Sequence, residues 1–233
     1  MDNATRLHYL QAMGIDVWIP KVASNAVDLP SPEADQADKS GVLIEQFVPT
    51  PNDNWETLQA EVSVCTRCAL CEARTQTVFG AGNKNADWMI VGEAPGQHED
   101  EQGLPFVGNA GLLLTEMLRA MGLNREDVFI SNIVKCRPPN DRDPEPAESK
   151  SCNDYLQRQC ALLKPKIILA VGRIAAQTLL KIDAPLTQLR GKVHTLNNTP
   201  VIVVYHPAYL LRTPSEKRNA WLDLQLAMQT HKT

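Results

Sequence analysis

The sequence lacks several features that would place the protein in a membrane, outside the cell or among the repeat proteins. No run approaches the roughly 18 apolar residues that indicate a membrane-spanning helix. The opening residues, MDNATRLHYLQAMGIDVWIPK, contain no basic segment followed by an apolar one, so we expect no export signal. No segment repeats at a fixed period. We therefore expect a cytoplasmic protein without membrane contact.

The sequence also has little net charge. The formal charge is −4 at pH 7, and the hydrophobic fraction of 43% is ordinary for a globular protein. The charge is unevenly spread, because residues 1–55 carry three basic and eight acidic side chains while the remainder carries 20 basic and 19 acidic. The larger part is thus nearly neutral. Its acidic total does not exclude a nucleic-acid partner, for which a local basic surface suffices.

Three regions differ in composition. Residues 1–22 contain a short amphipathic helical pattern, and residues 23–54 are polar and contain several prolines, which predicts a disordered linker. From 55 to 233, apolar runs alternate with helical patterns. We expect strands at 88–95, 127–136, 166–172, 193–196 and 200–207, and helices at 109–123, 145–163, 173–180 and 214–229.

The alternation of strands and helices predicts one α/β domain with a central, mainly parallel sheet of four to five strands flanked by helices. In such sheets the ligand lies at the carboxyl ends of the strands. Three loops stiffened by glycine or proline follow predicted strands: GEAPG, NIVKCRPPNDRDP and YHPAYLLR. We expect these loops to form one site.

The chain has only six cysteines, and three of them lie within CTRCALC, residues 65–71. Cys65 and Cys68 form a C-x2-C pair, and the fold could bring Cys136 and Cys152 beside it. Four thiolates suit either Zn²⁺ or an iron–sulfur cluster, and spacing alone does not choose between them. The alternative is that Cys136 and Cys152 are ordinary buried thiols. We interpret the other two as a spare thiol and a core residue: Cys71 and Cys160.

Four motifs occur in a characteristic order: CTRCALC (65–71), VGEAPGQHEDEQGLPFVGNAG (91–111), NIVKCRPPNDRDP (132–144) and VYHPAYLLR (204–212). Together they resemble the family 4 uracil-DNA glycosylases, whose members contain a [4Fe–4S] cluster. The resemblance extends from about residue 58 to 230. It implies the uracil-DNA glycosylase fold and removal of uracil from DNA in base excision repair, with no lyase step. It also implies the ligands of the cluster: Cys65, Cys68, Cys136 and Cys152.

This reaction requires that the base leave the duplex and be held in a pocket. Phe106 could stack on the extruded ring, and the Asn132 amide could read the Watson–Crick edge of uracil. A neutral His206 donating to uracil O2 would stabilise the departing anion. The alternatives are a core phenylalanine, a turn asparagine and a structural histidine. We expect the remaining uracil contacts in the GEAPG turn: Glu93, Ala94 and Pro95.

The group that activates the attacking water is less certain from the sequence. Better-known uracil glycosylases carry an aspartate at the position of Ala94, whereas the family resembled here usually has alanine or glycine. Glu99 and Asp100 are nearby candidates, and solvated loop acids are the alternative. His98 departs from the acidic residue expected at its position. For DNA itself we expect apolar wedges and phosphate contacts from Leu210, Leu211, Arg212, Arg137 and Arg142.

The segment RLHYLQAMGIDVWIPK resembles the N-terminus of the psi subunit of the bacterial polymerase III clamp loader, which docks onto the chi subunit. This resemblance suggests that residues 1–22 bind chi, and the alternative is a helix that packs on its own domain. Intact Phe106, Asn132 and His206 favour a monomeric, nucleoid-associated enzyme acting on uracil-containing DNA. The competing hypothesis is a non-catalytic replication or repair accessory protein.

Overall fold

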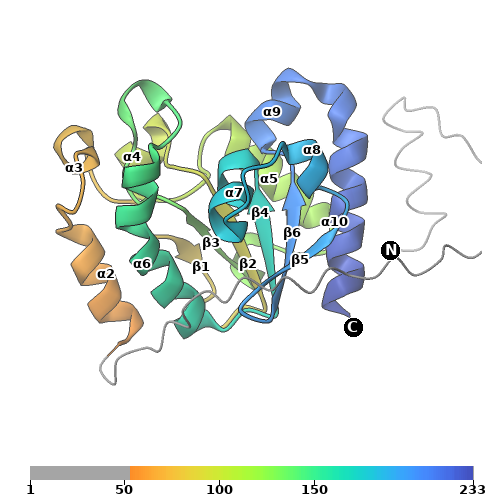
Figure 1. Cartoon of the computed structure of the whole chain (residues 1–233), viewed down its shortest axis with the longest axis horizontal. Helices are drawn as coiled ribbons and strands as arrows, with labels where there is room; N and C mark the ends of the chain where they lie inside the picture. The colour runs from red at the N-terminus through yellow and green to blue at the C-terminus, as the bar shows by residue number, and fades with distance from the viewer. Residues whose placement is uncertain (1–52, 233) are drawn as a thin grey trace, which may run out of the picture. The chain divides into compact units, whose positions relative to one another are not determined.

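The computed structural model describes residues 53–232, and these form a sheet between two layers of helices (Figure 1). The expected segments 1–22 and 23–52 lie outside the described residues, so the division into three regions stays a prediction. Among the described residues no helix has both the length and the apolar character to cross a membrane. The strands are β1 (Ala81–Gly82), β2 (Trp88–Gly92), β3 (Val128–Asn132), β4 (Ile167–Val171), β5 (Val193–Leu196) and β6 (Thr199–Val204).

The sheet has the order β1-β3-β2-β4-β6-β5. The four central strands are parallel, and β1 and β5 pair antiparallel at the two edges. All residues of β2, β3 and β4 are buried, because helices cover both faces, and this explains their unbroken apolar character. The predicted α/β class with a mainly parallel sheet is confirmed. The described sheet has six strands rather than four to five, since the two-residue β1 was not expected.

The longer helices start and stop at the signals that the sequence carries. They are α2 (Trp55–Ser63), α5 (Asn109–Ala120), α6 (Pro146–Leu163), α7 (Arg173–Leu180) and α10 (Lys217–His231). Proline occupies the first position of α6, where its missing N–H has no partner to lose, and Asn54 caps α2 with its side chain. The short helices are α3 (Leu70–Ala73), α4 (Gln97–Gln102), α8 (Leu186–Leu189) and α9 (Pro207–Arg212), with 3₁₀ turns at Arg125–Asp127, Pro139–Asp141 and Pro214–Glu216.

Two apolar clusters hold the helices against the sheet. Side chains of α2, α6 and α7 pack on one face, and those of α5, α9 and α10 pack on the other. Helices α2 and α6 lie side by side (Figure 1). They are joined at Arg158, whose guanidinium pairs with the carboxylates of Asp53 and Glu61. The parallel strands therefore end together at one rim of a rigid three-layer domain.

Candidate active site and cysteine cluster

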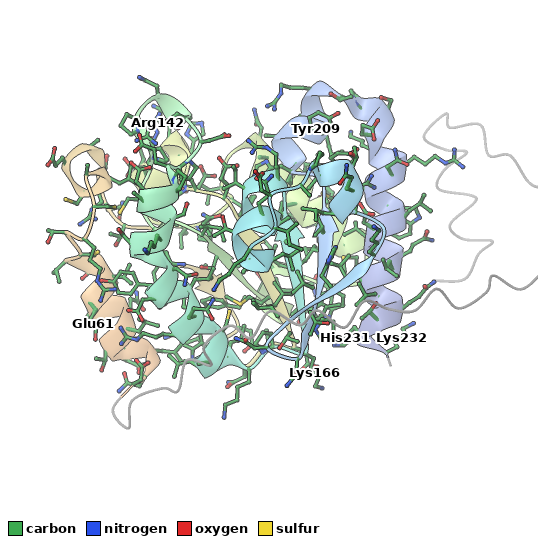
Figure 2. The ribbon with its side chains drawn as sticks, viewed as in Figure 1. Glu61, Arg142, Lys166, Tyr209, His231 and Lys232 are labelled. Atoms are coloured by element: carbon green, nitrogen blue, oxygen red, sulfur yellow. The ribbon has the colours of Figure 1, made fainter. Side chains whose placement is uncertain are left out.

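A cavity of about 650 Å³ opens where the parallel strands end. Two residues of its lining, Arg142 and Tyr209, lie at the same end of the molecule in Figure 2, opposite Lys166 and His231. The volume falls in the range of small-molecule pockets. Of the residues that the sequence nominated, those lining the cavity are Glu93, Ala94, Pro95, Glu99, Phe106, Asn132, Arg142, His206 and Arg212.

Phe106 forms one wall of the cavity and has an unusual backbone conformation. Its φ of 54° lies in the left-handed region, which bulky residues rarely adopt. A side chain at Gly111 would lie 1.8 Å from the Phe106 carbonyl oxygen, so only glycine allows this close packing. The Phe106 ring faces the His206 ring, with 5.7 Å between centroids. Strain of this kind persists where the surroundings hold a residue in place, often at a functional site.

Two charged side chains hold the Phe106 loop. The Glu99 carboxylate accepts hydrogen bonds from the amides of Val107 (2.8 Å), Gly108 (3.0 Å) and Gly96 (3.1 Å). The Arg125 guanidinium donates to the carbonyls of Pro105 (2.8 Å) and Phe106 (3.1 Å). Glu99 thus positions the aromatic wall while it also lines the cavity.

Asn132 ends β3 directly beside Phe106. Its side-chain oxygen is buried and has no hydrogen-bond partner within the described residues. Gly92 is paired with Asn132 in the parallel register, and a Cβ at Gly92 would lie 2.4 Å from that oxygen and 2.5 Å from the Phe106 ring. The absent side chain at Gly92 therefore lets the amide and the ring lie together. An orphaned buried acceptor in a cavity is expected to receive a hydrogen bond from a ligand.

His206 follows β6 and caps α9. Its Nδ1 accepts a hydrogen bond from the amide of Ala208 (3.2 Å), so a neutral imidazole carries its proton on Nε2. Burial, with the nearby positive charge of Arg212, lowers the pKa of His206 to about 4. The ring is consequently uncharged at neutral pH and presents a donor to the cavity.

A carboxyl pair occupies the wall opposite the aromatic residues. Burial, followed by the charge and hydrogen-bonding contact of Asp143, raises the pKa of Glu93 to about 7. Asp143 in turn pairs with Arg173, at 2.6 Å between Nη2 and Oδ2. Because Arg173 begins α7, this pair joins the loops that follow β3 and β4. Glu93 is accordingly a half-protonated group in the cavity at neutral pH.

The structure changes the prediction for the DNA wedge. The segment YHPAYLLR forms helix α9 after its first two residues, so its adjacent leucines point in different directions. Leu210 is 1% exposed and packs in the core, which removes it as a wedge, whereas Leu211 is 45% exposed. The two predicted phosphate contacts in the loop after β3 are paired within the chain, Arg137 with Asp141 and Arg142 with Glu148.

Asp100 is also misplaced in the sequence interpretation. It is 3% exposed, and both of its oxygens accept from the amide of Thr75, at 3.0 and 2.9 Å. It is not among the residues that line the cavity. Asp100 therefore has a structural role, because it fixes the segment after α3 to helix α4.

Five cysteines line a second, small cavity: Cys65, Cys68, Cys71, Cys136 and Cys152. Arg74 donates to the sulfur of Cys136 (3.0 Å) and to the carbonyl of Cys65 (2.7 Å), a contact suited to an electron-rich sulfur. Between residues 53 and 232 no group of three or more His, Cys, Asp or Glu side chains is close enough to hold a single metal ion. The four expected thiols share one cavity, and their chemistry fits a metal–sulfur group. Cys160 is not among them.

Sequence reasoning missed Arg125, Asp143, Arg173 and the steric role of Gly92. A signal existed for Arg173, because the Gly172–Arg173 pair follows a buried strand at its carboxyl end. No local signal marks Arg125, whose partners lie 19 and 20 positions away.

Comparison with known proteins gives consistent matches. A family model described as the uracil DNA glycosylase superfamily matches residues 79–225. The type-4 uracil-DNA glycosylase of Archaeoglobus fulgidus is 44% identical over 170 residues, covering 70% of this chain and 85% of that protein. The type-4 enzyme of Thermotoga maritima is 42% identical over 170 residues, covering 72% and 88%. A type-5 uracil-DNA glycosylase of Pyrobaculum aerophilum is 32% identical over 146 residues, covering 55% and 64%.

Proposed function

The chain belongs to the type-4 uracil-DNA glycosylase family, and on that premise we propose how its residues hydrolyse the N-glycosidic bond of uracil in DNA. The reaction leaves an abasic site and belongs to base excision repair. The observation that carries the proposal is the single cavity lined by Phe106, Asn132 and His206 at the ends of the parallel strands.

Phe106 and Asn132 are the proposed base-recognition pair. The ring offers a fixed surface on which the flipped base stacks. The unpartnered Asn132 oxygen would accept from uracil N3–H, while its NH₂ group donates to the adjacent carbonyl. Cytosine presents an unprotonated nitrogen and an amino group at the same edge. It would leave both groups of the amide opposed, and this mismatch supports selectivity for uracil.

His206 is the proposed catalytic residue. Bond cleavage transfers negative charge to uracil, and a neutral Nε2–H donor at O2 would stabilise that charge. The lowered pKa and the hydrogen bond from Ala208 to Nδ1 both support this protonation state. An imidazole that is already neutral loses no proton before it acts.

Glu99 is the proposed water-orienting residue. Three amides occupy its carboxylate, two on Oε1 and one on Oε2, which leaves acceptor capacity on Oε2 for a water molecule. In the same role it keeps the Phe106 loop in place. The backbone of the turn at Glu93, Ala94 and Pro95 would surround the uracil carbonyls.

Cys65, Cys68, Cys136 and Cys152 are the proposed ligands of a [4Fe–4S] cluster, with Zn²⁺ as the alternative. When bound, the group would serve as a structural clamp that joins the loop before α3 to the segment after β3 and to α6. We expect wild-type protein to contain iron and inorganic sulfide and to absorb in the visible range. Cys152→Ser should lose both, whereas Cys71→Ser should retain them. Zinc without sulfide in the wild type would refute the cluster.

DNA contacts are proposed for Leu211 as the wedge and for Arg137, Arg142 and Arg212 as phosphate partners. The exposure of Leu211 beside the cavity-forming helix α9 supports the first assignment. For the two arginines after β3, phosphate would have to replace or share the carboxylates of Asp141 and Glu148.

The decisive experiment measures single-turnover release of uracil from an oligonucleotide. We expect His206→Ala to slow release about 10²- to 10³-fold, as loss of one such donor does elsewhere. His194→Ala is the matched control, because His194 is half-buried on β5 and bonds only the Leu189 carbonyl. If metal-loaded wild type bound DNA without releasing uracil, the accessory hypothesis would replace the catalytic one.

We also propose that residues 1–22 tether the enzyme to the chi subunit of the clamp loader, which is supported by the sequence resemblance alone. Immobilised chi should retain the full-length chain and should not retain a chain lacking residues 1–22. Equal retention of both chains would end this proposal.

A further inference from the structure

Lys135 is a buried lysine that the proposed reaction does not use. It lies between Asn132 and Cys136 in sequence, is 1% exposed, and lines the cysteine cavity. Its ammonium donates to the hydroxyl of Ser131 (2.6 Å), the side-chain oxygen of Gln159 (2.7 Å) and the main-chain carbonyl of Asn132 (2.8 Å). Three oxygens thus take the three N–H donors of a charged ammonium group.

The cage around Lys135 supplies no negative charge. Its three acceptors are a hydroxyl, an amide and a main-chain carbonyl, and no carboxylate of residues 53–232 contacts the ammonium. The groups near Lys135 that can carry negative charge are the thiols of Cys136, Cys152 and Cys160. A buried charge is strongly unfavourable unless an opposite charge compensates it. The cysteine cavity is where that compensation can come from.

We propose that Lys135 is the buried counter-charge of the metal group held by the cysteines, an inference that rests on the proposed metal centre. Four thiolates around either an iron–sulfur cluster or Zn²⁺ leave a net negative charge in a poorly solvated cavity. Arg74 answers that charge from the loop side through the Cys136 sulfur. Lys135 answers it from inside the domain, where no solvent reaches.

Lys135 also connects the metal group to uracil recognition. The same ammonium that faces the thiols bonds the carbonyl of Asn132, whose side chain lies in the active-site cavity. Ser131 and Gln159 complete the cage and are themselves tied together, at 2.8 Å between Oγ and Oε1. Lys135 is therefore a positioning residue, and it acts on uracil only through Asn132.

The test replaces the charge and keeps the shape. Full-length Lys135→Met and Lys135→Arg are purified without oxygen, and iron, zinc and the rate of metal loss to a chelator are measured. We expect Lys135→Met to lose metal roughly 10- to 100-fold faster than wild type, as loss of an outer contact does at other metal sites, and Lys135→Arg to lose it more slowly than Lys135→Met. Where the metal is iron, the midpoint potential of Lys135→Met should fall, because the reduced centre has lost a nearby positive charge.

Lys166→Met is the matched control. Lys166 is exposed, pairs with Asp87 and lies at the opposite end of the molecule (Figure 2), so its substitution should leave metal retention unchanged. If Lys135→Met does not fold, Lys135→Gln serves as the neutral variant, since its amide can still donate to the cage. Neutral variants that match wild type in metal loss and in midpoint potential would overturn the inference alone. A wild type without metal would overturn the metal centre as well.

Discussion

Gly92→Ala is the sharpest probe of the uracil pocket. Gly92 has an ordinary backbone conformation, so alanine is allowed there and only the added methyl group matters. That methyl would lie 2.4 Å from the Asn132 side-chain oxygen and 2.5 Å from the Phe106 ring, while ordinary contact begins at 3.4 Å. Either the amide or the ring must therefore move by about 1 Å.

A displacement of that size has a predictable cost. A misplacement of about 1 Å in a catalytic site can lower the rate about 10²-fold. Overpacking of a core by one methyl group destabilises a protein by about 1–3 kcal/mol. We therefore expect kcat/KM for uracil release to fall about 100-fold, while the protein remains folded.

The assay compares single-turnover uracil release with thermal unfolding. Ala227→Val is the control, because Ala227 is fully buried on α10 and is not among the cavity residues. It should lose about 1–3 kcal/mol of stability through overpacking yet keep its activity. A Gly92→Ala protein with kcat/KM close to that of wild type would refute the placement of uracil between Asn132 and Phe106.

Further predictions concern the carboxyl pair and helix α9. Folding raises the pKa of Glu93 from 4.5 to about 7, so the folded protein keeps a proton there that the unfolded chain releases, and stability falls as pH rises through this window. Urea unfolding at several pH values should show that Glu93→Gln removes on the order of 1 kcal/mol of this fall, after allowance for partial solvation; an unchanged slope would contradict the assignment. Leu210→Ala should destabilise the protein by about 2–5 kcal/mol in thermal unfolding. Leu211→Ala should leave stability within about 0.5 kcal/mol and slow excision from duplex more than from single-stranded DNA; equal slowing would exclude a wedge.

The parallel strands were predictable because both of their faces are buried. WMIVG and IILAV carry no polar alternation, and helices cover them on both sides in the structure. The short helix α4 was not predictable, because QHEDEQ has no apolar periodicity. It is held by hydrogen bonds from Glu99 and Asp100 to amides elsewhere in the chain. Contacts of this kind are set by the assembled fold.

The cavity residues were predictable where a loop motif follows a strand, and they were missed where long-range packing decides. Phe106, Asn132 and His206 all come from such motifs and line one cavity. Leu210 was assigned wrongly, because helical geometry in α9 turns one of two adjacent leucines into the core. The steric role of Gly92 depends on the register that pairs it with Asn132, and a single sequence does not state that register.

The segment from Asn132 to Cys136 shows how closely the two sites are linked. One end lies in the uracil cavity, the other in the cysteine cavity, and Lys135 between them bonds the Asn132 carbonyl. Removal of the metal group would leave the Lys135 charge uncompensated and favour its movement toward solvent. Such movement would release the Asn132 carbonyl before it disturbs the strands. Loss of metal should therefore weaken uracil recognition while the sheet remains intact, and urea unfolding of metal-free protein alongside binding of uracil-containing DNA would separate the two effects.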